Sequence, residues 1–144
     1  MIIQTLGAKV LTQRAKRIAK VDDTIRSLCA AMIDTMLSNN GIGLAANQVG
    51  ILKAIIVILH QNEPKVLINP EIVEASETTC DFDEGCLSIP DTLFTINRPE
   101  KIKVKYRDTK GKPHFEEYDG LSARIIQHEI DHLMGITMNV RKNK

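Results

Sequence analysis

Tryptophan is absent from this 144-residue chain, and aromatic residues make up only 3% of it. A dominant charge is also missing, because 19 basic residues face 18 acidic ones and the net charge is +1. A near-neutral chain has no electrostatic footprint for nucleic acid or for an anionic membrane surface. We therefore expect no direct binding to nucleic acid.

Long apolar runs are missing as well. No uninterrupted run is longer than that of residues 54–59, which is far short of the ~20 residues that a membrane-spanning helix needs. Polar residues interrupt residues 1–17, so this segment does not resemble a secretory signal. The three cysteines, an odd number, do not predict a disulfide framework and leave at least one thiol free. These features predict a cytoplasmic protein with no membrane partner.

No repeat, low-complexity tract or linker divides the sequence, so we expect one domain over residues 1–144. A chain of this length buries on the order of 70% of its unfolded surface, enough for a core without metal or disulfide staples. A metal in this protein should therefore serve function more than stability.

Hydrophobic periodicity predicts helices near both ends of the chain. Apolar residues recur at helical spacing over residues 25–37, with Asp22 or Asp23 as cap, residues 39–41 as the end, and Cys29 on the buried face. Residues 121–134 return to this spacing, with Asp119 as a candidate cap and Gly135 as the end.

Strand patterns lie between these helices. Residues 54–59 are β-branched and short, which is typical of a strand buried on both faces, and residues 66–69 predict its neighbour. Residues 101–107 and 113–118 alternate around a polar loop and predict a hairpin whose lysines face solvent. We predict an α+β fold in which antiparallel or mixed sheets pack around the second helix.

The sharpest chemical signal is the sequence HEIDH at residues 128–132. Residues i and i+4 share one helical face, so His128 and His132 can reach one metal ion while Glu129 lies beside it. A catalytic site needs a third protein ligand, and residues 133–144 contain neither His nor Glu. The third ligand must therefore come from upstream, and the candidates are Cys86, Cys80, His60, His114 or a carboxylate. The pattern alone predicts His60 in a loop and His114 on an exposed strand.

Two further segments have unusual compositions. GIGLAANQ (41–48) combines small residues, which allow close backbone approach, with the amide donor of Gln48. EGCLSIP (84–90) places Cys86 between a glycine and a proline. The first segment is not a phosphate loop, because it lacks the Lys-Ser/Thr ending and opens no obvious helix.

Together, GIGLAANQ, EGCLS and HEIDH resemble the three motifs of the peptide deformylase family, in the family's order and over most of the chain. The resemblance implies a hydrolase that removes the N-formyl group from formyl-methionyl nascent peptides and releases formate. It implies Cys86, His128 and His132 as ligands of one divalent metal, natively Fe(II), with Zn, Ni or Co possible in preparations. Glu129 would be the general base and acid for the attack of a metal-bound water.

The resemblance also assigns the remaining residues. Gln48 and the backbone N–H of Leu87 would stabilise the oxyanion. The substrate-binding residues, for the peptide and its methionine side chain, would be Ile42, Gly43, Glu84, Gly85, Arg98, Leu121 and Ile125. Arg98 would pair with the Glu84 carboxylate, whereas Cys80 has no role in the family motif and is expected to be a free thiol.

Two other functions stay open from the residues alone: an HExxH zinc endopeptidase, and a non-catalytic metal domain that binds formyl-methionyl ends. Many bacterial deformylases continue into a long C-terminal helix that contacts the ribosome, and here the sequence stops at Lys144. We expect a short, monomeric form without this docking helix, for which a ribosome contact stays open. Short forms occur in phages, in which case the location would be the cytoplasm of the bacterial host.

Overall fold

A computed structural model of the chain describes residues 1–141. Its helices are α1 (Asp23–Ser38), α2 (Gly120–Leu133) and α3 (Met138–Arg141), with two short 3₁₀ helices, η1 (Lys9–Thr12) and η2 (Ala46–Val49). The strands are β1 (Gly43–Ala45), β2 (Ile55–His60), β3 (Glu63–Ala75), β4 (Thr79–Cys86), β5 (Ile89–Pro99), β6 (Lys101–Arg107) and β7 (Pro113–Asp119). The prediction of a mixed α+β fold with antiparallel sheets is confirmed.

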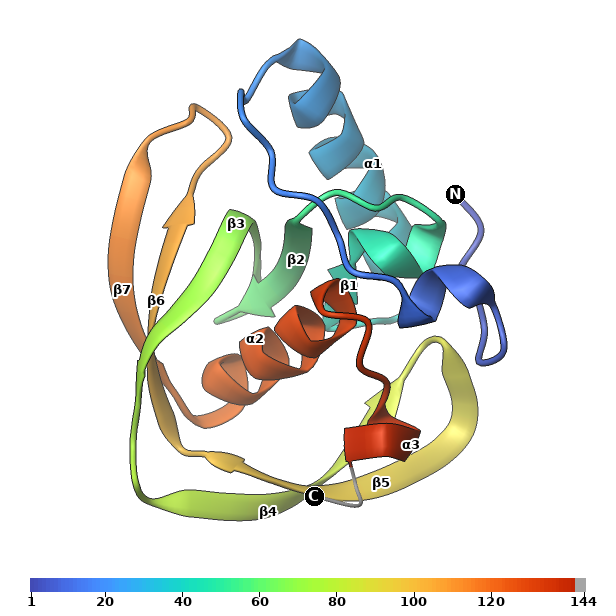
Figure 1. Cartoon of the computed structure of the whole chain (residues 1–144), viewed down its shortest axis with the longest axis vertical. Coiled ribbons are helices and arrows are strands. Elements are labelled where there is room, and N and C mark those ends of the chain that lie inside the picture. Colours follow the sequence, from blue (N-terminus) through green and yellow to red (C-terminus); the bar gives the residue numbers. More distant parts are fainter. Residues whose placement is uncertain (142–144) are drawn as a thin grey trace.

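The strands form two separate antiparallel sheets. Five strands pair in the order β1-β2-β3-β6-β7, and β4 pairs with β5 in a two-stranded sheet. Figure 1 shows α2 enclosed by the curved larger sheet and the β4–β5 hairpin, with α1 near β1 and β2. Strand β1 lies at one edge of the larger sheet.

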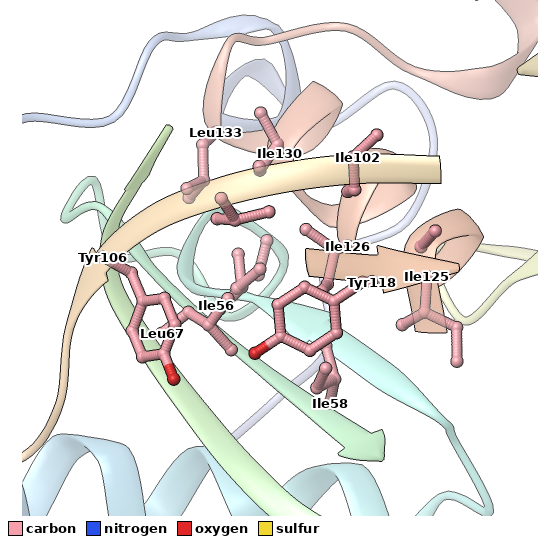
Figure 2. Packing of buried hydrophobic residues seen from close by; sticks show 13 residues of the cluster. Ile56, Ile58, Leu67, Ile102, Tyr106, Tyr118, Ile125, Ile126, Ile130 and Leu133 are labelled. Atoms are coloured by element: carbon pink, nitrogen blue, oxygen red, sulfur yellow. The ribbon is translucent and has the colours of Figure 1, made fainter. Parts of the chain in front are cut away.

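Both faces of β2 are buried, as its β-branched sequence predicts. Ile56 and Ile58 belong to the cluster that packs against α2, which Figure 2 shows, whereas Ile55 and Val57 pack with α1 residues such as Met32. On α1, Asp22 caps the helix because its side chain accepts a hydrogen bond from the Ile25 N–H at 3.0 Å. Cys29 is buried on this helix, and burial raises the pKa of its thiol to about 11.

Several sequence predictions need correction. The strand expected at 66–69 runs from Glu63 to Ala75, with a shift of register between Ile68 and Glu71 that accommodates Pro70 outside the ladder. Residues 46–49, where no helix was expected, form η2. Asp119 occupies the N-cap position of α2 but makes no side-chain capping bond.

The predictions for two histidines also change. His60 is the last residue of β2 rather than a loop residue, and its Nδ1 lies 2.7 Å from the Ser122 hydroxyl oxygen. His114 lies on β7 as predicted but is half-buried, with its Nε2 2.8 Å from a carboxylate oxygen of Asp108. Both rings are therefore engaged in local hydrogen bonds.

None of the helices within residues 1–141 combines the length and the apolar character needed to cross a bilayer.

Strand β6 follows the predicted alternation, because Lys101 and Lys105 are exposed while Ile102 and Val104 are buried.

Candidate metal centre

Three side chains from two elements converge beside α2. Cys86 ends β4, and His128 and His132 lie one turn apart on α2. The Cys86 Sγ is 3.3 Å from the His132 Nε2, which is 3.2 Å from the His128 Nε2. Donors of one tetrahedral ion lie roughly 3.3–3.7 Å apart for bond lengths of about 2.0–2.3 Å. Within residues 1–141, these three form the one His/Cys/Asp/Glu group whose donors all lie within 4.8 Å of one another.

The other candidates for the third ligand lie elsewhere. His60 contacts Ser122, His114 contacts Asp108, and Cys80 is exposed near the start of β4. The structure therefore selects Cys86 from the alternatives that the sequence left open. A thiolate with two imidazoles is a soft donor set that suits Zn, Fe, Co or Ni and disfavours Mg or Ca.

Glu84 fixes the orientation of the His128 ring. The Nδ1 of His128 donates to the Glu84 Oε1 at 2.8 Å, which aims the Nε2 toward Cys86 and His132. Arg98 donates to both oxygens of the same carboxylate, at 2.7 and 2.9 Å. Burial disfavours the charge on Glu84, but the hydrogen bonds from His128 and Arg98 lower its pKa to about 2.

The two histidines are electrostatically coupled. Burial opposes charge on both rings, but the carboxylate of Glu129 and the hydrogen bonds with Cys86 and Glu84 raise the pKa of His128. Burial and the charge of His128 together lower the pKa of His132 to about 3. The pKa values of the two rings therefore move in opposite directions, and binding of a metal ion would require both rings to be neutral.

Glu129 lies beside the cluster, and one of its carboxylate oxygens is buried without a partner among the described residues. This oxygen is Oε1, and the side chain as a whole is buried. Burial raises the pKa of Glu129 to about 7. Gly43 leaves room for it, because a Cβ at position 43 would lie 2.6 Å from the Glu129 Oε2 and 2.8 Å from Ile125 Cγ2, so that both side chains would have to move.

Gln48 is held by three hydrogen bonds. Its Oε1 accepts from the Ala45 N–H at 2.9 Å, which turns the Nε2 toward Ser88 Oγ at 3.1 Å and Cys86 Sγ at 3.4 Å. Leu87 lies in the turn between β4 and β5 and is half-buried. Both therefore flank Cys86, as expected, while the Gln48 amide is also engaged with the sulfur.

A cavity of about 600 Å³ opens at this cluster. Its lining includes Cys86, His128, Glu129, Gln48 and Leu87, together with six of the seven predicted substrate contacts: Ile42, Gly43, Glu84, Gly85, Leu121 and Ile125. A neighbouring cavity of about 910 Å³ shares three of these residues but none of the metal donors. The chemistry therefore belongs to the smaller cavity.

Arg98 departs from the predicted substrate contacts. It does not line the cavity, and its side chain is only 5% exposed. Beside its bonds to Glu84, its Nη1 donates to the Asp131 Oδ2 at 2.8 Å. Arg98 thus lies beneath the site and supports Glu84.

Sequence reasoning missed several polar residues around this support. Arg124 contacts Glu84, and Arg141 of α3 donates to both oxygens of Asp131, at 3.0 and 2.6 Å. Position 124 precedes His128 by one helical turn, so the i, i+4 rule could have placed Arg124 on the same face.

Comparison with known proteins gives the family. The polypeptide deformylase family model matches residues 1–144. The chain belongs to this family. A peptide deformylase of Picosynechococcus is 55% identical over 136 residues, covering 91% of this chain and 73% of the relative.

Solved structures of peptide deformylases share the fold. The Thermotoga maritima structure matches with a TM-score of 0.94 and 43% identity, covering 96% of this chain and 95% of that one. The structure from Synechococcus elongatus, in complex with actinonin, matches with a TM-score of 0.93 and 47% identity, covering 96% and 76%. Peptide deformylases are metal-dependent hydrolases, and the Cys86–His128–His132 cluster of this member is the candidate metal site.

Proposed function

We propose that this deformylase family member removes the N-formyl group from formyl-methionyl peptides of newly made proteins and releases formate. The observation that carries the proposal is the convergence of three soft metal donors with a buried, partly unsatisfied carboxylate at one cavity. This set matches what metal-assisted hydrolysis of an amide requires: ligands, a base and room for the substrate.

Cys86, His128 and His132 are the proposed ligands, and Fe(II) is the proposed native ion, with Zn, Ni or Co as alternatives in preparations. The fit rests on the spacing of the three donors and on the His128 tautomer that Glu84 fixes. An ion bound there would act as a Lewis acid that activates a water molecule for attack on the formyl carbon.

Glu129 is the proposed general base and acid. Its unpartnered Oε1 can accept the proton of the attacking water, and the protonated side chain can then deliver it to the departing amide nitrogen. The pKa of about 7, raised by burial, suits a group that must both accept and release a proton near neutral pH.

Gln48 and the Leu87 N–H are the proposed donors to the developing oxyanion. Because Ala45 holds the Gln48 Oε1, the amide nitrogen stays directed toward Cys86 when it exchanges the weak 3.4 Å contact with sulfur for the substrate oxygen. A donor of this kind contributes roughly 3 kcal/mol to transition-state stabilisation.

The edge strand β1 is the proposed docking site for the peptide backbone. The carbonyl of Ile42 accepts from the Leu59 N–H at 2.9 Å and is therefore already used within the sheet. Gly43 and Gly85 flank the cavity and would supply the added-strand contacts. Ile42, Leu121 and Ile125 would receive the methionine side chain.

The protein would act in the cytoplasm as a monomeric catalytic domain, where formylated nascent chains are made. Residues 142–144 lie outside the described residues, so the absence of a C-terminal docking helix stays a prediction.

The test is formate release from formyl-Met-Ala-Ser by anaerobically iron-loaded protein, with the unformylated peptide as control. We expect turnover of the formyl peptide and no cleavage of a peptide bond in either substrate. Peptide-bond cleavage would indicate the endopeptidase instead. Tight binding of the formyl peptide without formate release would indicate the non-catalytic binding domain.

A further inference from the structure

Arg124 connects the two elements that carry the candidate metal ligands. It lies on α2, one turn before His128, and its Nη1 donates to the Glu84 Oε2 on β4 at 2.5 Å. The same nitrogen donates to the carbonyl of Ile96 on β5 at 3.0 Å, and the Nη2 donates to the carbonyl of Cys80 on β4 at 2.6 Å. One guanidinium therefore contacts both strands of the hairpin.

The side chain of Arg124 is also packed against its neighbours. The guanidinium carbon lies 5.5 Å from the centroid of the Phe82 ring, and the Arg124 side chain is only 11% exposed. A planar fork that donates in several directions and stacks on a ring is a property of arginine that lysine does not share.

The hairpin depends on such contacts for its position. Strands β4 and β5 pair with each other and with no strand of the larger sheet, and an isolated two-stranded hairpin has marginal stability in water. Strand β4 has one buried residue, Glu84, and the apolar burial of β5 is against α3, where Ile89 and Ile96 pack with Met138. The location of Cys86 relative to His128 and His132 therefore depends strongly on the contacts that tie the hairpin to α2.

Arg98 makes a second contact between the hairpin and α2, through the carboxylate of Asp131. It lies on β5 and, by pairing with Glu84 on β4 and with Asp131 near the end of α2, neutralises the Glu84 carboxylate. Loss of Arg124 would leave Glu84 paired with Arg98 and His128, so no buried charge would be left alone. What would be lost are two bonds from α2 to the hairpin backbone, at Cys80 and Ile96, while Gln127 would still donate to the carbonyl of Pro99 at the end of β5.

We propose that Arg124 is a positioning residue that holds the Cys86-bearing hairpin in register with the histidines of α2, so that the three donors meet. The inference rests on the proposed assignment of Cys86, His128 and His132 as metal ligands. It predicts that Arg124 controls the affinity and geometry of the metal site without touching the ion.

The experiment titrates Co(II) into the metal-free full chain and compares wild type with Arg124→Met and Arg124→Lys. Competition with a chelator gives the affinity, and the visible and near-ultraviolet bands report four-coordinate Co(II) and its thiolate bond. We expect Arg124→Met to lower the affinity about 10–100-fold, the range for residues that orient ligands, and to weaken the thiolate band. The Co(II) affinity of Arg124→Lys should lie between those of wild type and Arg124→Met. Lysine restores the ion pair with Glu84 but not the several hydrogen bonds of the planar guanidinium.

Arg26→Met is the matched control. Arg26 also lies on a helix, pairs with the carboxylate of Asp23 and donates to two carbonyls, those of Val21 and Thr109, but it contacts none of the donor residues. It should leave Co(II) affinity and the spectrum unchanged. Thermal unfolding of each metal-free variant shows whether it is folded. If Arg124→Met does not fold, the Co(II) affinity of Arg124→Lys tests the proposal.

Wild-type Co(II) affinity and spectrum in a folded Arg124 variant would overturn the proposal. An equal loss in Arg26→Met would do the same, because it would show a general effect of stability. Failure of the wild-type protein to release formate would overturn the proposed function, but it would leave the effect of Arg124 on the metal site intact.

Discussion

At the residue scale, the site combines satisfied and unsatisfied groups. Glu84 accepts four hydrogen bonds, from two Arg98 nitrogens, Arg124 and His128, whereas the buried Oε1 of Glu129 accepts none from residues 1–141. A buried carboxylate oxygen without a partner costs stability, and such costs concentrate at functional sites. This difference indicates that Glu84 supports the site and that Glu129 is the reactive carboxylate, although both line the same cavity.

Glu129→Gln tests this separation. The amide has nearly the same shape but cannot accept the proton of the attacking water, so turnover of formyl-Met-Ala-Ser should fall by about 10²–10⁴-fold. Metal content after dialysis should stay at the wild-type level. Glu71→Gln, a neutralised carboxylate on an exposed part of β3, should have normal turnover. Near-normal turnover of Glu129→Gln would remove Glu129 from the role of base.

At the element scale, the strength of the hydrophobic pattern decided what could be predicted. Residues 23–38 and 120–133 have long amphipathic periods, and β2 is buried on both faces, so these elements were predicted nearly to their ends. The hairpin β4–β5 was not delimited, because its strands are mostly exposed and polar. Its position depends on ionic contacts between residues far apart in the sequence, such as Arg98 with Asp131, which no local pattern contains.

The residues of the candidate site also fall into those that the sequence could predict and those that it could not. Cys86, His128, His132 and Glu129 stand in motifs whose residue types indicate their chemistry, so the sequence could predict that they converge. Arg124 and Arg141 resemble ordinary surface arginines in the sequence, and only the fold brings them to Glu84 and Asp131. The family resemblance implied the Arg98–Glu84 pair, which the structure contains, but the rest of the buried support was the part that sequence reasoning could not place.

The end of α2 gives a prediction at this scale. Gly135 follows the helix with φ +75°, and a Cβ at this position would lie 2.7 Å from the Thr12 carbonyl oxygen. Gly135→Ala should therefore cost more than the roughly 1–2 kcal/mol of left-handed strain alone, because the backbone of η1 must also move. Thermal unfolding measures the cost.

Gly111→Ala is the control for that substitution. Gly111 has φ +81°, but its nearest neighbour would be Val21 Cβ at 3.7 Å, an ordinary contact. Gly111→Ala should therefore have the strain of a left-handed φ without a steric clash, and its melting temperature should fall less than that of Gly135→Ala. Equal losses in the two variants would contradict the account of a close approach between α2 and η1.

At the scale of the whole molecule, the core does not depend on the metal. One apolar cluster fills the space between α2 and the larger sheet, and a second joins α1 to the other side of β2. The candidate ligands lie outside both clusters, where the hairpin meets α2. An ion would therefore tie the hairpin to a body that is already folded.

Metal removal should consequently loosen the molecule without unfolding it. We expect the metal-free protein to melt cooperatively, and metal at 100 times its Kd to add about 2.7 kcal/mol of stability, on the order of a 10 °C rise in melting temperature for a chain of this size. Amide exchange should slow mainly in β4 and β5. Cys86→Ala, which lacks the donor from the hairpin, should gain much less on metal addition. Global unfolding by a chelator would instead make the ion a structural staple, because the two apolar clusters would then be insufficient to hold the fold.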